Sequence, residues 1–178
     1  MPFPTVLARA REGDEAAFAA LYRSHHPRLS RYLTATAGAD GEDLAHDVWC
    51  AVAEQLPSFE GDERGFRSWL FTIAHRRRVD HLRKKSRRDT APWAPEDFED
   101  LRAPGSTAGS ALGSVTVSEA LDKLSSLPPN QAEVVLLAVL GDLDAPSIGA
   151  IVGKRAGTVR VLQHRGLRRL AEERAATA

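Results

Sequence analysis

Two groups of basic side chains are the residues of this chain best suited to chemistry, and the larger group follows two aromatic residues. Trp69 and Phe71 precede the block Arg76-Arg77-Arg78, which continues through Arg83-Lys84-Lys85 and Arg87-Arg88. Cations neutralise phosphates and aromatic rings stack on bases, so this pattern suits a partly single-stranded DNA. Two other interpretations stay open, because charge runs are often merely solvated and a tryptophan at core spacing is often buried.

The second basic group lies near the C-terminus, in a pattern typical of a helix-turn-helix. Two helical segments over 146–170 meet at Gly153-Lys154-Arg155, and Ile148 is expected to pack against Val159 where they cross. The second segment and its start present donors and a methyl-sized contact suited to a major groove: Arg155, Thr158, Arg160, Val161, His164 and Arg165. The alternative is an ordinary helical hairpin with a solvated basic face.

An acidic stripe marks the predicted helix that ends before Pro57. It carries Asp43, His46, Asp47 and Glu54. The first three could be metal ligands, but one helix supplies few convergent groups and no partner triad stands elsewhere in the sequence. A protein-docking face or a solvated face is the better interpretation.

Signatures of catalysis are missing from the sequence. It contains no glycine-rich phosphate loop, no HExxH and no Gly-x-Ser-x-Gly, and Cys50 stands mid-helix without an evident base. Asp142 and Asp144 have the pattern of turn and cap residues, and His25-His26 that of a polar surface pair. We therefore expect a protein that is not an enzyme and uses no cofactor, metal or small-molecule substrate.

The expected compartment is the cytoplasm. A single cysteine cannot form an internal disulfide, and the N-terminus lacks the basic and apolar segments of an export signal. No run of about 18 apolar residues predicts a membrane span.

The formal net charge of zero hides a strong segregation of charge along the chain. Residues 1–63 carry 5 basic and 11 acidic side chains, whereas residues 64–88 carry 10 basic and 1 acidic. A clustered basic block is the electrostatic footprint of nucleic-acid binding. We also expect a compact free protein, in which acidic residues 1–63 or an acidic linker screen this block.

Apolar residues recur at helical spacing through most of the chain, and no strand-like alternation is present. The pattern predicts a helix from Asp14 that kinks or breaks at Pro27, a helix from Glu42 to Leu56, and a third from Phe66 into the basic block. A shorter helix over 117–124 and another beginning at Pro128-Pro129 precede the helix-turn-helix.

Residues 89–114 have the composition of a flexible linker, because they are rich in proline and small residues and lack an apolar period. The predicted fold class is therefore all-α. It consists of two small helical domains, 1–88 and 115–178, joined by the linker 89–114, and the C-terminal domain contains the helix-turn-helix.

Four stretches in this order resemble one family. Residues 43–48 (DLAHDV) resemble the polymerase-binding part of region 2 of extracytoplasmic-function sigma factors, and residues 66–83 resemble its promoter-melting and minus-ten part. Residues 127–134 (LPPNQAEV) and 157–165 are similar to region 4, which reads the minus thirty-five element. The chain is identified on these motifs as a member of this group of the sigma-70 family.

The resemblance implies partners and roles for the residues. Core RNA polymerase would bind through its beta-prime clamp and beta flap, with the clamp on Asp43, His46, Asp47 and Glu54. The minus-ten DNA, with one base flipped against Phe59, would contact Phe59, Arg64, Trp69, Arg76, Arg77 and Arg83. The minus thirty-five DNA would contact the C-terminal set from Arg155 to Arg165.

Two features of the resemblance extend or limit these expectations. Members of the family are often held inactive by an anti-sigma factor, so such a partner is expected here.

Arg76 stands where many members have asparagine, and Gln163 occupies a position that is usually apolar. The base-reading residues of this chain are therefore expected to differ from the common set.

Two other functions fit parts of the sequence. A plain helix-turn-helix regulator that binds duplex DNA alone accounts for the C-terminal segment but leaves residues 1–88 unexplained. A DNA-processing hydrolase that uses the carboxylates of the second helix requires a bound metal and activity without polymerase.

Overall fold

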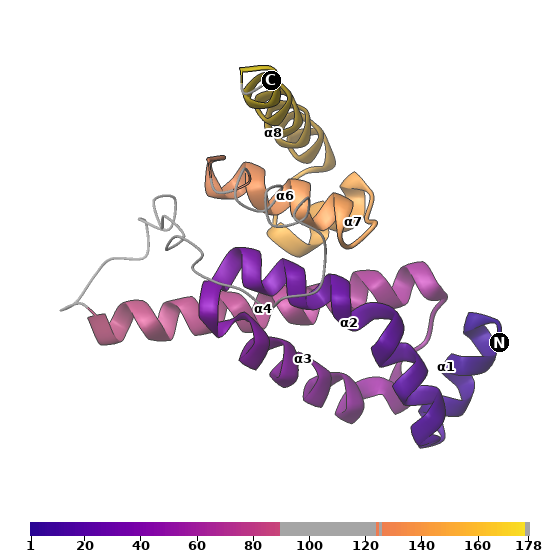
Figure 1. Cartoon of the computed structure of the whole chain (residues 1–178). Helices are drawn as coiled ribbons and strands as arrows, with labels where there is room; N and C mark the ends of the chain where they lie inside the picture. Colours follow the sequence, from indigo (N-terminus) through magenta and orange to yellow (C-terminus); the bar gives the residue numbers. More distant parts are fainter. Residues whose placement is uncertain (90–123, 125, 177–178) are drawn as a thin grey trace.

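The computed structural model describes residues 1–89, 124 and 126–176, and every regular element in that part of the chain is a helix or a 3-10 turn (Figure 1). The N-terminal group comprises α1 (Phe3–Arg11), α2 (Glu15–Ala37), η1 (Gly38–Asp40), α3 (Gly41–Gln55), η2 (Leu56–Ser58) and α4 (Glu63–Asp89). The C-terminal group comprises α6 (Pro129–Val139), α7 (Ala145–Val152) and α8 (Ala156–Ala176). These elements confirm the all-α class. Linker residues 90–114 and most of the helix predicted over 117–124 lie outside the described residues.

Helix α2 corrects the prediction of a break at Pro27, because it continues from Glu15 to Ala37 with the proline inside. Proline removes one backbone hydrogen bond and crowds the preceding turn, which costs about 3 kcal/mol or more in an isolated helix. Here Leu21, six residues before the proline, and Leu29, two residues after it, are buried in the core. Burial of both flanks keeps the helix in one piece.

Helix α1 was not predicted from the sequence. Phe3, Val6, Leu7 and Ala10 recur at helical spacing over barely two turns, and Leu7 and Ala10 are buried. So short a helix is marginal alone and depends on its contacts with the rest of the chain.

His25 is buried, so the prediction that it belongs to a polar surface pair is wrong. Its ring is 5% exposed and lies 5.1 Å from the ring of Phe66 and 6.4 Å from that of Phe3. Burial lowers the pKa of His25 below its ordinary value. Its neighbour His26 is half-buried and stacks on Tyr22 at 4.5 Å.

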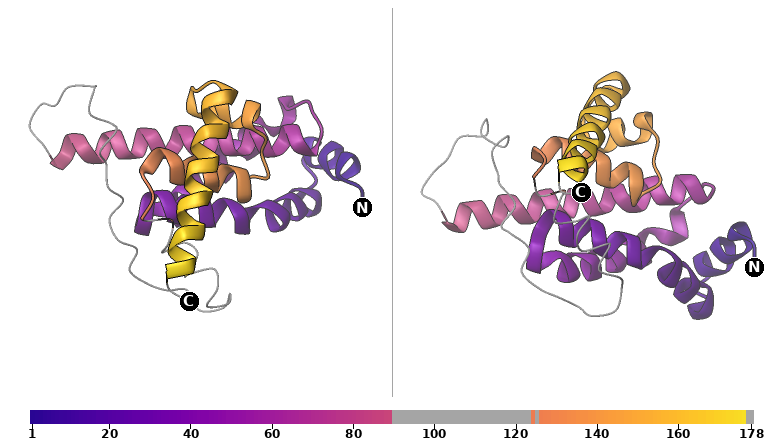
Figure 2. Two further views of the ribbon diagram at one scale, coloured as in Figure 1. Left: turned by 90° about the horizontal axis from the view of Figure 1, so that it is seen from above. Right: turned by 45° about the horizontal axis from the view of Figure 1, so that its top comes forward.

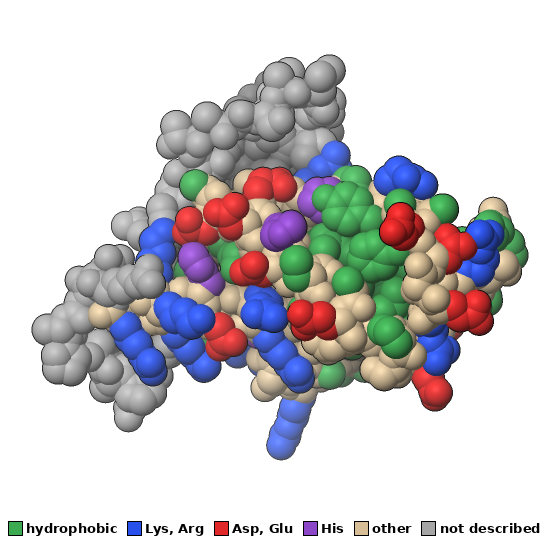
Figure 3. All heavy atoms as spheres, turned by 90° about the horizontal axis from the view of Figure 1, so that it is seen from below, with side chains coloured by type: hydrophobic (Ala, Val, Ile, Leu, Met, Phe, Trp, Pro, Cys, Tyr) green, Lys and Arg blue, Asp and Glu red, His purple; other side chains and the backbone are tan. Residues whose placement is uncertain are grey.

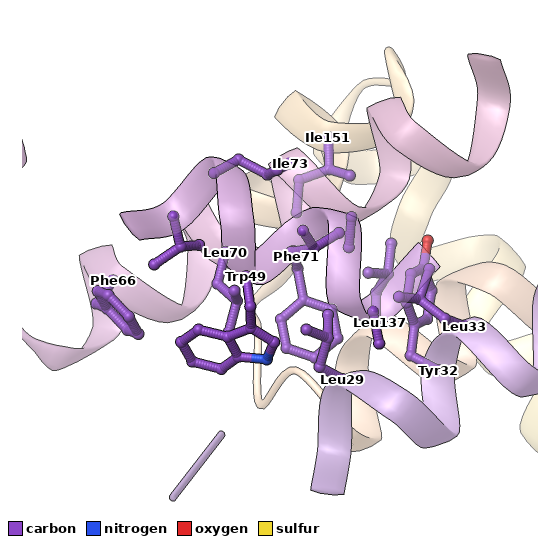
Figure 4. Packing of buried hydrophobic residues seen from close by; sticks show 14 of the residues in the cluster. Leu29, Tyr32, Leu33, Trp49, Phe66, Leu70, Phe71, Ile73, Leu137 and Ile151 are labelled. Atoms are coloured by element: carbon purple, nitrogen blue, oxygen red, sulfur yellow. The ribbon is translucent and has the colours of Figure 1, made fainter. Parts of the chain in front are cut away.

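A single hydrophobic cluster joins the two groups of helices. Figure 4 shows part of this cluster, which includes Leu29, Tyr32, Phe71, Leu137 and Ile151. Helices α6 and α7 lie between α8 and the long helix α4 (Figures 1 and 2). The C-terminal group is therefore packed on α2 and α4 through α6 and α7.

Side chains cap the starts of two helices as the sequence indicates. Asp14 accepts a hydrogen bond from the backbone N–H of Ala17, and Asp144 accepts one from that of Ser147. Capping carboxylates satisfy backbone donors that have no partner within the helix. Asp144 thereby fixes the beginning of α7, the first helix of the helix-turn-helix.

Gly149 lies where α7 is crossed by the backbone that follows it. A Cβ atom at this position would lie 2.4 Å from the carbonyl oxygen of Lys154, which is closer than real Cβ atoms approach. Gly166 is similarly crowded, since its Cβ would lie 2.9 Å from Cγ2 of Val135. Both glycines allow close packing of the helices at these points.

We expect Gly149→Ala to lower the free energy of unfolding by about 1–3 kcal/mol, because the added methyl group forces the turn apart. The matched control is Gly157→Ala in α8, where a Cβ would meet nothing within 4 Å. That change is expected to be neutral or to stabilise the helix by up to about 1 kcal/mol. Urea unfolding of both variants checks this, and equal effects would contradict close packing at Gly149.

Candidate nucleic-acid interface

The N-terminal half of α4 begins beside an aromatic cluster. Phe59 stacks on Trp69 with ring centroids 4.8 Å apart and meets Phe66 edge-on at 5.7 Å. Asp62 accepts a hydrogen bond from the backbone N–H of Gly65 at 2.7 Å, which stabilises the first turn of α4. Trp69 is half-buried in this cluster, so it packs on Phe59 and keeps part of its ring exposed.

The basic residues of α4 point in more than one direction. Arg76, Arg77 and Arg83 are exposed, whereas Arg67 and Arg78 retain only 16% and 13% of their side-chain exposure. Arg76 and Arg83 border a hollow between α4 and α7, together with His75 and Ile151. The predicted minus-ten arginines 76, 77 and 83 are therefore available at the surface.

Asp40, a residue of the N-terminal group, screens part of the basic block. Its Oδ2 lies 2.9 Å from Nζ of Lys85 and 3.0 Å from Nε2 of His81. Hydrogen bonds from Lys85 and then His81 hold the pKa of Asp40 below its ordinary value. This pair of contacts agrees with the expectation that acidic residues of 1–63 screen the block, although the predicted acidic linker lies outside the described residues.

The acidic stripe occupies the outer face of α3. Asp43, His46, Asp47 and Glu54 are all exposed, and Asp47 borders a shallow groove shared with Arg77 and Lys84 of α4. Figure 3 looks onto this side of the molecule, where hydrophobic side chains gather beside acidic ones and Lys and Arg gather toward the lower left. In the described part of the chain, no group of three or more His, Cys, Asp or Glu could hold a metal ion.

The helix-turn-helix has the predicted packing. Ile148 of α7 and Val159 of α8 are fully buried, and Leu162 packs against the same cluster. Gly153 ends α7 in the left-handed conformation with φ of 70°, which glycine adopts without strain. Every residue predicted to contact the minus thirty-five DNA is exposed: Arg155, Thr158, Arg160, Val161, His164 and Arg165. Helices α7 and α8 therefore pack against each other as predicted and leave these residues exposed.

A polar cluster at the junction of the two groups was not predicted from the sequence. Oε1 of Glu133 lies 2.5 Å from Nη2 of Arg78, 2.8 Å from Nδ1 of His75 and 3.1 Å from Oη of Tyr32. Burial alone would raise the pKa of Glu133, but the hydrogen bond from His75 and the charge of Arg78 lower it to about 2. Burial raises the pKa of Tyr32. Tyr32, His75 and Arg78 each lie more than 50 positions from Glu133 in the sequence. No local sequence pattern could therefore have predicted their contacts with it.

A second set of contacts missed by sequence reasoning involves the turn between α6 and α7. Asp144 pairs with Arg64, and Oδ2 of Asp142 lies 3.2 Å from Nη2 of Arg67. Asp142 has a positive φ of 50°, which aspartate tolerates better than most residues. Arg64, predicted to contact DNA, is therefore engaged by a carboxylate of the C-terminal group.

The basic helix α4 and the helix-turn-helix of α7 and α8 are features typical of helical DNA-binding proteins. Family models for Sigma-70 region 2 and for Sigma-70, region 4 match residues 21–88 and 118–170. With the relatives described next, these matches show that the chain belongs to the extracytoplasmic-function sigma factors of the sigma-70 family. Sigma factors are transcription regulators, and this chain is an RNA polymerase sigma factor.

Individual relatives agree with the family models. The chain is 36% identical over 175 residues to the ECF sigma factor ShbA of Streptomyces griseus, covering 93% of this chain and 91% of ShbA. It is 30% identical over 168 residues to BldN of Streptomyces coelicolor, covering 93% of this chain but only 63% of BldN. The solved structure of RpoE from Bartonella quintana, in complex with the anti-sigma factor NepR, has the same fold. Its TM-score is 0.67 at 22% identity, over 87% of this chain and 94% of that one.

Within the described ranges, no helix combines the length and the apolar character needed to cross a membrane.

Proposed function

We propose that this sigma factor docks on core RNA polymerase through α3 and holds the two promoter elements on α4 and α8. One observation carries the proposal: an exposed acidic face and an exposed basic face lie on neighbouring helices, with a helix-turn-helix packed beside them. A single surface could not attract both a basic protein partner and DNA, whereas two adjacent faces of opposite charge can. The polymerase then performs all nucleotide chemistry.

The polymerase contact is assigned to Asp43, His46, Asp47 and Glu54, in agreement with the family resemblance. All four are exposed on one helix, and the neighbouring exposed ring of Tyr22, which packs on the buried Trp49, adds an apolar contact. Interfaces of this composition combine an aromatic anchor with charges that steer the partner. The proposed partner surface is the beta-prime clamp, and the beta flap is proposed to bind the C-terminal group.

The minus-ten contact is assigned to Arg76, Arg77 and Arg83, with Phe59, Arg64 and Trp69 near the flipped base. Extracting a base from the duplex costs a few kcal/mol, which stacking on an aromatic ring and neutralised phosphates can offset. The stack of Phe59 on Trp69 supplies ring surface beside the basic helix. The loop before α4 is therefore the proposed position of the unpaired base.

The minus thirty-five contact is assigned to the exposed face of α8 and its start. Arg160, His164 and Arg165 offer donors to base edges or phosphates, and Val161 offers an apolar contact to a thymine methyl group. Arg155 stands beside the N-terminus of α8, where backbone N–H groups favour phosphate.

An anti-sigma factor is the proposed regulatory partner, acting in the cytoplasm where the polymerase is found. One solved structure with this fold, that of RpoE, is a complex with the anti-sigma factor NepR, and another, that of CnrH, is a complex with the cytosolic domain of CnrY.

Run-off transcription with core polymerase tests the proposal. The intact chain is expected to support initiation, and Asp43→Ala with Asp47→Ala is expected to reduce it roughly fivefold at subsaturating chain, because two exposed charge contacts are lost. Added chain should restore the signal, since only docking is weakened. Glu12→Ala with Glu15→Ala removes two exposed charges elsewhere and should change nothing. Tight duplex binding by the chain alone, with no initiation, would favour the plain regulator.

A further inference from the structure

The face of α4 that meets the C-terminal group is a row of cationic and hydrogen-bonding side chains. Arg64, Arg67, His75 and Arg78 stand at helical spacings of 3, 11 and 14 from the first. These spacings bring all four to one side of the helix. Each of them contacts an acidic side chain of α6 or of the turn that follows it.

The two contacts at the start of α4 are exchangeable. Asp142 and Asp144 keep 69% and 42% of their side-chain exposure, and Arg64 keeps 59%. Arg67 keeps 16% and also pairs with Glu63, so its contact with Asp142 is exposed on the aspartate side. Pairs in such contact with water are individually weak and compete poorly with a multivalent polyanion. Asp142 and Asp144 also offer two negative charges, two residues apart, to two neighbouring arginines, as successive phosphates of a strand would.

The contact further along α4 is of a different kind. Glu133 and Arg78 retain only 15% and 13% of their exposure, and one carboxylate oxygen serves Tyr32, His75 and Arg78 together. Removing a partner from such a buried group leaves a charge without compensation. This cluster holds α6 in register on α2 and α4, so that the turn carrying Asp142 and Asp144 lies over Arg67 and Arg64.

We propose that the turn between α6 and α7 is an internal competitor for the promoter strand, with Asp142 and Asp144 occupying the arginines that the strand's phosphates would use. The free chain is then closed and binds single-stranded DNA weakly. DNA or polymerase that separates the two groups releases Arg64 and Arg67. The inference rests on the proposed function, because it requires that the strand binds at the start of α4.

The test uses the full chain with Asp142→Asn and Asp144→Asn. Asparagine keeps the cap at the start of α7 and tolerates the positive φ at position 142, so the fold is preserved while both charges are removed. The probe is a fluorescein-labelled pool of random 12-nucleotide single-stranded DNA. The variant is expected to bind it about fivefold more tightly than the unmodified chain at low salt. The control for net charge is Glu12→Gln with Glu15→Gln, which also removes two negative charges. This control is expected to bind the DNA probe severalfold less tightly than the asparagine variant does.

Arg64→Gln with Arg67→Gln separates failure of this inference from failure of the proposed function. Added to the asparagine variant, these changes are expected to abolish the gain in affinity. If the asparagine variant binds no better while the arginine changes weaken the unmodified chain, the strand does use these arginines and the internal competitor is refuted. If the arginine changes affect no form of the chain, the proposed strand contact itself is wrong.

Discussion

Replacing Glu133 with alanine is expected to destabilise the packed arrangement of the two helical groups by about 3–5 kcal/mol. The carboxylate is the shared acceptor of Tyr32, His75 and Arg78, and without it Arg78 keeps its charge in a site where its side chain is 13% exposed. This destabilisation cannot exceed the free energy that holds the two groups of helices together. Once the groups separate, Arg78 is in contact with water again and its charge costs nothing further. The variant should therefore open before the N-terminal group unfolds.

The separation can be measured by energy transfer between two dyes. Cys50 is the single cysteine of the chain and is exposed on α3, and a second can be introduced as Glu172→Cys on the exposed surface of α8. Glu133→Ala should shift the distance distribution to larger values and lower the midpoint of thermal unfolding. Asp80→Ala, which removes a 3.9 Å exposed pair with Arg83, is the control and should stay within about 0.5 kcal/mol of the unmodified chain. An unchanged distribution in Glu133→Ala would contradict a stabilising role for this cluster.

Acid is expected to remove the same stabilisation without a mutation. Burial opposes ionisation of Glu133, but His75 and Arg78 outweigh it and lower its pKa from 4.5 to about 2. A carboxyl group whose pKa is lower in the folded chain contributes its full stabilisation above about pH 4.5 and loses it as the pH falls toward 2. A difference of this size corresponds to about 3 kcal/mol.

Urea unfolding at a series of pH values between 6 and 2 checks this expectation. The unmodified chain should lose about 3 kcal/mol more over that range than Glu133→Gln, which has no charge to lose. Asp14, Asp40 and Asp144 also have lowered pKa values, but they are present in both proteins and cancel in the comparison. Parallel pH profiles would show that Glu133 is not held ionised by its neighbours.

Helices whose apolar spacing is regular could be predicted from the sequence. The bounds of α3, the basic helix α4 and the turn at Gly153 follow from periodicity, capping residues and glycine, which act within a few residues of one another. The exposed sets on α3 and α8 follow from the same spacing, since the side opposite the apolar stripe faces water. Family motifs are local in the same sense, so the family could also be predicted.

Contacts between distant segments decided the rest. The sequence places His25 beside a second histidine and a proline, which indicates a surface, yet α1 and Phe66 bury it. It likewise places Pro27 where a break is expected, although the buried flanks of α2 keep the helix continuous. Packing of α1 and α4 against α2 outweighs these local preferences.

The charge pattern by itself determined that a basic helix would need acidic partners, and the tertiary structure decided which ones. Asp40 lies in the acidic segment that the sequence indicated, but Glu133, Asp142 and Asp144 come from a C-terminal group whose charges nearly balance. Pairing of charges depends on distances of a few ångströms between side chains. Only the packing of α6 and α7 on α4 sets those distances, because the residues concerned are separated by 55 to 80 positions of chain.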